Sequence, residues 1–160
     1  MRITIAAIGR MKAGAERDLA DTYIARARAL GRQAGITGLE VREGPESTAA
    51  SAELRRAEET QRLLQGLDPQ AYVIALDERG TAITSPAFAT RLGGLATDGK
   101  GELAFLIGGP DGLDRALVAG AGLVLAFGPM TWPHRLARAM LAEQIYRAVT
   151  ILVNHPYHRA

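Results

Sequence analysis

Residues 103–112 read LAFLIGGPDG, five consecutive apolar residues followed by a glycine-rich turn. We predict a strand at 103–107 that ends at Gly108. A second compact apolar run, AYVIAL at 71–76, has the composition of a strand buried on both faces of a parallel sheet. Strand and helix patterns alternate on either side of these runs. This alternation indicates an α/β fold in three layers, with a parallel sheet between two layers of helices.

The other elements follow from local periodicity and from capping residues. Three further strands are expected at residues 3–8, 36–41 and 123–127, and helices at 15–33, at 51–66, from Ser85 onward, shortly after Gly112, and at about 133–149. Ser51 and Ser85 are the expected N-caps of two of these helices. The 160 residues show no repeat, low-complexity tract or linker, so residues 1–160 are predicted to form a single domain.

Composition excludes several classes of protein. The chain is 48% hydrophobic but has no uncharged apolar run of about 18 residues, so we expect no transmembrane helix. The N-terminal apolar stretch is short and lacks a cleavage site, unlike a signal peptide. The lack of cysteine excludes a disulfide scaffold and thiolate metal sites, and is consistent with a cytoplasmic location. His155 and His158 are separated by Pro156 and have no obvious third ligand, so no metal site is predicted.

Positive charge is concentrated near the C-terminus. The whole chain carries a formal net charge of only +2. From residue 129 onward, a single acidic residue, Glu143, is accompanied by four arginines, which are Arg135, Arg138, Arg147 and Arg159. Two interpretations remain open. The arginines contact phosphate groups, or they form the solvated face of a helix on which Glu143 pairs with Arg147.

Ligands of open parallel sheets bind beyond the carboxyl ends of the strands. Three loops at such ends carry unusual residues, namely 76–80, 108–112 and 127–132. None of them is a familiar nucleotide fingerprint, and the P-loop-like spacing of Gly9 and Gly14 lacks the Lys-Ser/Thr pair that must follow. The glycines from Gly108 onward either let a ligand approach the backbone or form a tight turn. Trp132 either belongs to such a site or packs on the core at a helix entry.

Four motifs combine into a more specific pattern. They are FLIGGPDGL at 105–113, PMTWPHR at 129–135, LAEQIYRA at 141–148 and NHPYHR at 154–159. Together they resemble the RlmH family of the SPOUT superfamily, whose members methylate N3 of a pseudouridine in 23S ribosomal RNA. The resemblance extends from the first strand to the last residues, and the chain length also matches.

The resemblance implies a fold, a cofactor and an oligomeric state. The C-terminal segment would pass through a loop to form a deep trefoil knot, and two chains would form a homodimer with the active site at their interface. S-adenosylmethionine would bind in the knot loops, at the positions Leu76, Gly108, Phe127, Gly128, Pro129, Met130, Thr131 and Trp132. Many relatives have serine where Gly128 stands, so only backbone contacts are expected at that position.

The resemblance also implies roles for the C-terminal residues. Methyl transfer from a sulfonium is an in-line displacement, and the N3–H of the target must lose its proton. We expect His158 to act as base or proton relay and Tyr157 to orient the uracil, although either of them could accept the proton. Arg147 and Arg159 would hold a phosphate or a base carbonyl.

The expected partner is the ribosome, through a stem-loop of large-subunit RNA at the subunit interface. Because the chain has no RNA-binding appendage, recognition would depend mainly on shape. Further candidates for phosphate contacts are Arg10, Lys12, Arg135 and Arg138. Two alternatives remain: a SPOUT methyltransferase that modifies another nucleotide, for example in tRNA, and a non-catalytic ribosome-binding factor that keeps the fold without turnover.

Overall fold

Strands and helices alternate along residues 1–158, the part of the chain that the computed structural model describes. The strands are β1 (Arg2–Ile8), β2 (Gly38–Gly44), β3 (Tyr72–Thr81), β4 (Glu102–Ile107) and β5 (Leu123–Leu125). The helices are α1 (Ala15–Gly31), α2 (Ala52–Leu64), α3 (Ser85–Thr97), α4 (Arg115–Gly120) and α5 (His134–Leu152), with short 3₁₀ turns at Arg32–Ala34 and Pro156–His158. No helix in this part of the chain is both long and apolar enough to cross a membrane.

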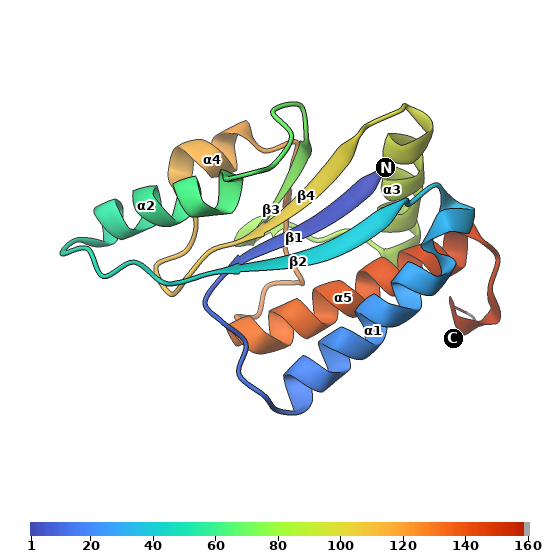
Figure 1. Cartoon of the computed structure of the whole chain (residues 1–160), viewed down its shortest axis with the longest axis horizontal. Helices are drawn as coiled ribbons and strands as arrows, with labels where there is room; N and C mark the ends of the chain where they lie inside the picture. The colour runs from blue at the N-terminus through green and yellow to red at the C-terminus, as the bar shows by residue number, and fades with distance from the viewer. Residues whose placement is uncertain (159–160) are drawn as a thin grey trace.

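The five strands form one parallel sheet in the order β2-β1-β4-β3-β5, and helices cover both of its faces (Figure 1). Helices α1, α3 and α5 pack on one face, and α2 and α4 pack on the other. In β1, Ile3 and Ile5 face the first group, whereas Ala6 and Ile8 face the second, as the alternation of a strand requires. The predicted three-layer α/β fold is therefore confirmed, while the trefoil knot stays a prediction.

The predicted elements are present, but several of their ends differ for local reasons. The second strand begins at Gly38 because the amide of Ile36 is used to end α1, where it donates to the carbonyl of Gly31 (2.9 Å). β5 ends at Leu125, two residues earlier than predicted, and α5 continues to Leu152. Periodicity thus located the elements, and backbone hydrogen bonds outside the periodic pattern decided where they end.

The two predicted helix caps have different outcomes. Ser51 caps α2 as predicted, because its hydroxyl accepts a hydrogen bond from the amide three residues later. Ser85 is not the cap of α3; the hydroxyl of Thr84 accepts the capping hydrogen bond instead. The Ser85 hydroxyl donates to Gln144 Oε1 (2.7 Å) and so links α3 to α5. A sequence with adjacent threonine and serine does not distinguish which of the two adopts the extended backbone of a cap.

A buried carboxylate joins the amino ends of the central strands. Glu102 begins β4 and is 2% exposed. It accepts hydrogen bonds from the Arg2 guanidinium, the Thr4 hydroxyl and the Asp68 backbone amide. Burial alone would raise the pKa of Glu102, but these three donors and the charge of Arg2 lower it below its usual value. The carboxylate is therefore charged at neutral pH, and it stabilises this edge of the sheet.

Replacing Glu102 with glutamine is expected to lower the free energy of unfolding at pH 7 by about 2–3 kcal/mol, because buried donors lose a charged acceptor. The folded-state pKa is lowered, so this stabilisation is present above the unfolded-state pKa and is lost as the pH falls through the lower folded value. Urea unfolding should therefore show that the free energies of unfolding of the two proteins converge below about pH 4. Lys100→Gln, at an exposed site nearby, is the control. A difference in the free energy of unfolding that is as large at pH 3 as at pH 7 would contradict this account.

Candidate functional site

The carboxyl ends of β4, β3 and β5 meet at one edge of the sheet. Leu76 of β3 pairs with Ile107 of β4 and with Leu125 of β5. Gly108 directly follows Ile107, and the 127–132 loop begins two residues after Leu125. The structure therefore brings together the three places at which cofactor contacts are expected. β3 continues past Leu76 as far as Thr81, which again pairs with Leu125 of β5. Local patterns did not predict this extension.

The 127–132 loop presents apolar side chains to solvent. Met130 and Trp132 are 69% and 40% exposed, so Trp132 does not pack into the core. Its indole Nε1 donates to the carbonyl of Phe127 (3.2 Å), which closes the loop on itself. Gly128 has a φ of +98°, and a Cβ at this position would meet no heavy atom within 4 Å. The loop thus combines an apolar rim with a stretch of backbone that a ligand could approach.

Steric demands explain the glycines of the 108–112 turn. A Cβ on Gly108 would lie 2.6 Å from the carbonyl carbon of Gly112, and one on Gly109 would lie 2.8 Å from Glu59 Oε2. The amide of Gly112 donates to the carbonyl of Gly109 (2.9 Å). The glycines therefore form a tight turn, which fixes the backbone of Gly108 directly beyond the end of β4 and leaves the approach of a ligand to that backbone a prediction.

Polar side chains anchor both loops to neighbouring parts of the chain. Arg55 of α2 donates to the two carboxylate oxygens of Asp111, from Nε at 2.6 Å and from Nη2 at 3.2 Å. This guanidinium lowers the pKa of Asp111. In the other loop, the Thr131 hydroxyl donates to Glu78 Oε2 (3.2 Å). The partners are 56 and 53 residues apart in sequence, so neither contact follows from a local pattern.

His134 is a residue of this region that sequence reasoning missed. It begins α5 directly after the 127–132 loop, and its Nε2–H donates to the carbonyl of Gly108 (2.8 Å). Burial lowers the pKa of His134, although the hydrogen bond to Gly108 and the charge of Glu46 oppose the shift. The ring is therefore neutral at pH 7. The available signal was its position in the PMTWPHR motif, between a strand-end loop and a helix.

The C-terminal tail folds back against α5 and α1. The hydroxyl of Tyr157 lies 3.1 Å from Glu143 Oε1 and 3.2 Å from the hydroxyl of Tyr23. Arg147 donates from Nε to the same carboxylate oxygen (2.9 Å), and its guanidinium carbon lies 5.1 Å from the centroid of the Tyr157 ring. The pairing of Glu143 with Arg147 is thus confirmed. The structure brings two of the predicted catalytic residues, Arg147 and Tyr157, to a common acidic partner.

The two candidate bases in the tail differ in their surroundings. Burial raises the pKa of Tyr157, and hydrogen bonds with Tyr23 and Glu143 raise it further, so its hydroxyl stays protonated at neutral pH. His158 Nδ1 is buried and has no hydrogen-bond partner among residues 1–158. These surroundings favour His158 over Tyr157 as the proton acceptor. Arg159, which is expected to hold a phosphate or a carbonyl, lies outside the described residues.

The tail and the strand-end loops are far apart within one chain. His134, at the beginning of α5, contacts Gly108, whereas Arg147 lies on the same helix 13 residues later. At 1.5 Å per residue, this separation is about 20 Å along the helix axis. The structure therefore separates the expected catalytic residues from the expected cofactor positions, which the sequence motifs alone did not indicate.

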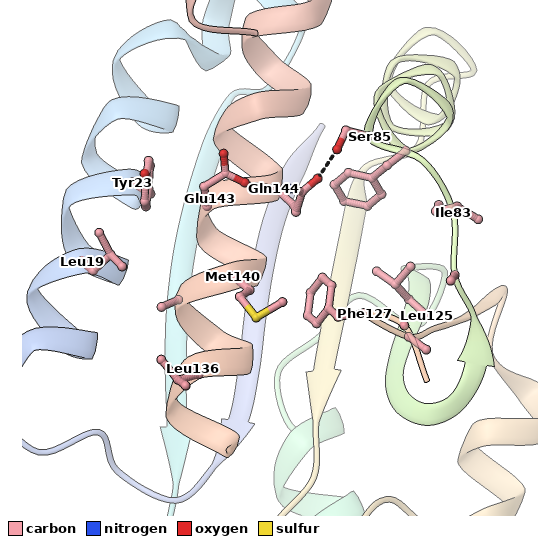
Figure 2. Close-up of a pocket in the computed structure, with 15 residues that line it drawn as sticks. Leu19, Tyr23, Ile83, Ser85, Leu125, Phe127, Leu136, Met140, Glu143 and Gln144 are labelled. Atoms are coloured by element: carbon pink, nitrogen blue, oxygen red, sulfur yellow. Dashed lines mark hydrogen bonds between the residues drawn. The ribbon is translucent and has the colours of Figure 1, made fainter. Parts of the chain in front are cut away.

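An apolar groove extends between the two regions (Figure 2). Its volume is about 420 Å³, and its walls come from α1, α3, α5 and the segments that follow β3 and β5. Phe127 faces Met140 of α5 across the groove, and Leu136 lies one turn before Met140. Tyr23 and Glu143 line the groove further along α1 and α5. The groove thus joins the 127–132 loop to the acidic partner of the tail.

The predicted RNA-contacting residues do not all lie on the surface. The exposed ones are Arg10, Lys12 and Arg135. Arg138 is only 6% exposed, forms an ion pair with Glu43 and donates to the carbonyl of Gly9 (3.0 Å). The guanidinium of Arg138 thus holds α5 against the sheet, and the contact of Arg138 with phosphate stays a prediction.

Side chains that bind metals are dispersed over the described structure. Within residues 1–158, no group of three or more His, Cys, Asp or Glu side chains is placed to hold a metal ion. His155 has a local role instead, since its Nδ1 accepts a hydrogen bond from the backbone amide of Tyr157 (3.2 Å).

Comparison with known proteins gives consistent matches over the whole chain. A family model described as "Predicted SPOUT methyltransferase" matches residues 1–158. Relatives named ribosomal RNA large subunit methyltransferase H are 53% identical in Brucella anthropi, 52% in Xanthobacter autotrophicus and 52% in Rhizobium meliloti, each with 100% of both chains covered. A solved structure of a probable methylase family protein from Haemophilus influenzae is 17% identical, with a TM-score of 0.49 over 97% of this chain and 69% of that one.

Proposed function

The chain belongs to the SPOUT methyltransferase family, and on this basis we propose that it transfers a methyl group from S-adenosylmethionine to N3 of a pseudouridine in large-subunit ribosomal RNA. The observation that carries the proposal is the convergence of Leu76, Gly108 and the 127–132 loop at one edge of the sheet. The same name on relatives that are about half identical over their full length supports ribosomal RNA as the substrate.

The residues at this edge fit S-adenosylmethionine. Bound there, the cofactor would supply an electrophilic methyl group on a sulfonium. The exposed apolar side chains of Met130 and Trp132 would pack against it, and peptide groups at Leu76, Gly108 and the loop would hydrogen-bond its polar atoms. Gly128 leaves open space in front of the loop backbone, so a ligand can approach closely there.

The tail residues take complementary parts in the transfer. His158, whose Nδ1 has no hydrogen-bond partner among residues 1–158, accepts the N3 proton of the target base. Tyr157 stays protonated and orients the uracil through its hydroxyl or its ring. Arg147 is held in place by Glu143 and presents its remaining donors to a phosphate or a carbonyl oxygen. The contribution expected of Arg159 stays a prediction.

A second copy of the chain completes the site in this proposal. Because Arg147 lies about 20 Å along α5 from His134, which contacts the turn at Gly108, the tail and the arginine that serve one set of loops would come from the partner. The groove between these regions is lined by Leu19 and Leu136, which are 47% and 39% exposed. Exposed apolar side chains gathered around a groove are typical of a protein interface. We therefore assign the groove to a homodimer interface.

The substrate in this proposal is the assembled ribosome in the cytoplasm. Arg10, Lys12 and Arg135 are exposed, and each follows the carboxyl end of a strand or the loop beyond it. Their charges would contact phosphates of a large-subunit stem-loop at the subunit interface. Recognition would then depend on the shape of a structured RNA target.

The decisive experiment is transfer of labelled methyl from S-adenosylmethionine to ribosomes that lack the modification, followed by mapping of the labelled nucleotide. Label at N3 of one large-subunit pseudouridine is the expected result. Label on another nucleotide would change the substrate but keep the methyltransferase. Cofactor binding without any label would direct the search to other RNAs. The absence of both would favour a non-catalytic ribosome-binding factor.

Substitution of Gly108 tests the cofactor positions directly. Gly108→Ala places a methyl group 2.6 Å from the backbone of Gly112, so the turn must shift. We expect a loss of about 1–3 kcal/mol of stability, as overpacking typically causes, and a rise of at least about tenfold in the Kd for S-adenosylmethionine. Gly94→Ala is the matched control, because a Cβ there meets nothing within 4 Å. Unchanged affinity in Gly108→Ala, measured by calorimetry, would remove this turn from the cofactor site.

A further inference from the structure

The first two turns of α5 hold the backbone beyond two neighbouring strands. His134 donates from Nε2–H to the carbonyl of Gly108, beyond the end of β4 (2.8 Å). One turn later, Arg138 donates to the carbonyl of Gly9, beyond the end of β1 (3.0 Å). β1 and β4 are paired along their length. One face of α5 therefore fixes the carboxyl ends of both central strands.

We propose that His134 is a positioning residue that sets the gap between the turn at Gly108 and the 127–132 loop. The 127–132 loop enters α5 through Pro133, so His134 is joined covalently to this loop. Its hydrogen bond to Gly108 joins it to the turn. The inference rests on the proposed function, in which this gap receives S-adenosylmethionine. His134 acts through Gly108 and need not touch the transferred methyl group.

The surroundings of His134 suit this role. Gly108 is buried, so its carbonyl oxygen needs a hydrogen-bond donor from the protein. Burial lowers the pKa of the imidazole most, the charge of Arg138 lowers it further, and the hydrogen bond to Gly108 and the charge of Glu46 raise it. The resulting neutral ring carries its proton on Nε2, the tautomer that the contact with a carbonyl oxygen requires. A side chain that keeps a donor at this distance should therefore preserve the gap.

Two substitutions separate the hydrogen bond from the rest of the side chain. Glutamine can place an amide N–H close to the position of Nε2, whereas alanine removes the donor. We expect His134→Ala to raise the Kd for S-adenosylmethionine about tenfold and His134→Gln to stay within about threefold of the unaltered protein. The KM for S-adenosylmethionine should follow the Kd, while the KM for ribosomes should not change.

A second measurement needs no ligand. Hydrogen–deuterium exchange of the peptide covering residues 108–113 should accelerate in His134→Ala and remain slow in His134→Gln. Leu95→Ala, a core substitution near the opposite edge of the sheet, is the control for general loss of stability. It should lower the melting temperature without changing the Kd or the exchange of this peptide.

The outcomes distinguish the inference from the function on which it rests. If His134→Ala matches the unaltered protein in both Kd and exchange, the inference is overturned. The same holds if glutamine fails as completely as alanine, because the hydrogen bond would then not be the cause. If the unaltered protein does not bind S-adenosylmethionine, the proposed cofactor is wrong. The gap then loses the role assigned to it, whatever the rate of hydrogen–deuterium exchange at residues 108–113.

Discussion

Two impaired variants are expected to restore methyl transfer when their subunits are mixed and assayed at an S-adenosylmethionine concentration below the raised Kd of Gly108→Ala. Gly108→Ala disables the strand-end loops and leaves the tail intact, whereas His158→Ala does the reverse. Random exchange of subunits makes half of the dimers mixed, and each mixed dimer then has one complete site out of two. The mixture should therefore recover about one quarter of the activity of the unaltered protein.

The length of α5 is the reason for expecting this result. Methyl transfer requires the reacting atoms to approach within about 3–3.5 Å. Within one chain, the position of Arg147 and the contact of His134 with Gly108 are about 20 Å apart along the helix. A hinge in the middle of a straight, well-packed helix would be needed to close that distance. A partner that packs against the groove brings its own tail to the loops without such a change.

A pair of variants from the same region provides the control. Arg147→Ala and His158→Ala both alter the tail, so neither subunit of their mixed dimer can complete a site, and their mixture should stay inactive. The measurement is transfer of labelled methyl to ribosomes, first by the mixture and then by mixed dimers purified through two different affinity tags, which should recover about one half of the activity of the unaltered protein. Inactivity of the mixed Gly108→Ala and His158→Ala dimers, despite proof of mixing, would mean that each chain holds a complete site.

The strands and their terminal loops could be predicted because they depend on local features. An uninterrupted apolar run such as residues 103–107 indicates burial on both faces, and the glycines after it indicate a turn. The carboxyl ends of parallel strands share one edge whatever the strand order is. Leu76, Gly108 and the 127–132 loop could therefore be predicted as neighbours before the order β2-β1-β4-β3-β5 was known.

Contacts between distant elements could not be predicted in this way. Periodicity places Arg138 on a helix face near Arg135, but it does not show that Glu43, 95 residues earlier, lies opposite that face. The same limit applies to His134, whose partner Gly108 is 26 residues away. An arginine-rich helix therefore looked more solvated in the sequence than it is in the structure.

The arrangement of the tail also depends on tertiary contacts. The protonation of Tyr157 is set in part by Tyr23, which is 134 residues away, so the sequence did not decide which of Tyr157 and His158 accepts the proton. The motifs also do not show how far apart the strand-end loops and the tail lie within one chain. The structure shows that a helix separates them, and this separation is what makes a second chain necessary in the proposed mechanism.

Introducing a charge into the groove is expected to abolish both dimerisation and activity. Leu136→Glu places a carboxylate beside Met140 and Phe127, where the proposed interface leaves no basic partner among the lining residues. A twofold interface receives the change twice, and each buried unpaired charge costs several kcal/mol. We expect a monomer in sedimentation at micromolar concentration and a loss of methyl transfer of at least about a hundredfold.

An exposed leucine on the other layer makes the comparison specific. Leu54 lies on α2, on the opposite side of the sheet, and is 56% exposed against 39% for Leu136. Leu54→Glu should therefore leave the dimer and the activity unchanged, because it removes a similar apolar surface from a helix outside the groove. A dimeric and active Leu136→Glu would show that the groove is not the interface. The separation along α5 within one chain would remain after that result. The partner's tail would then have to reach the strand-end loops through another interface.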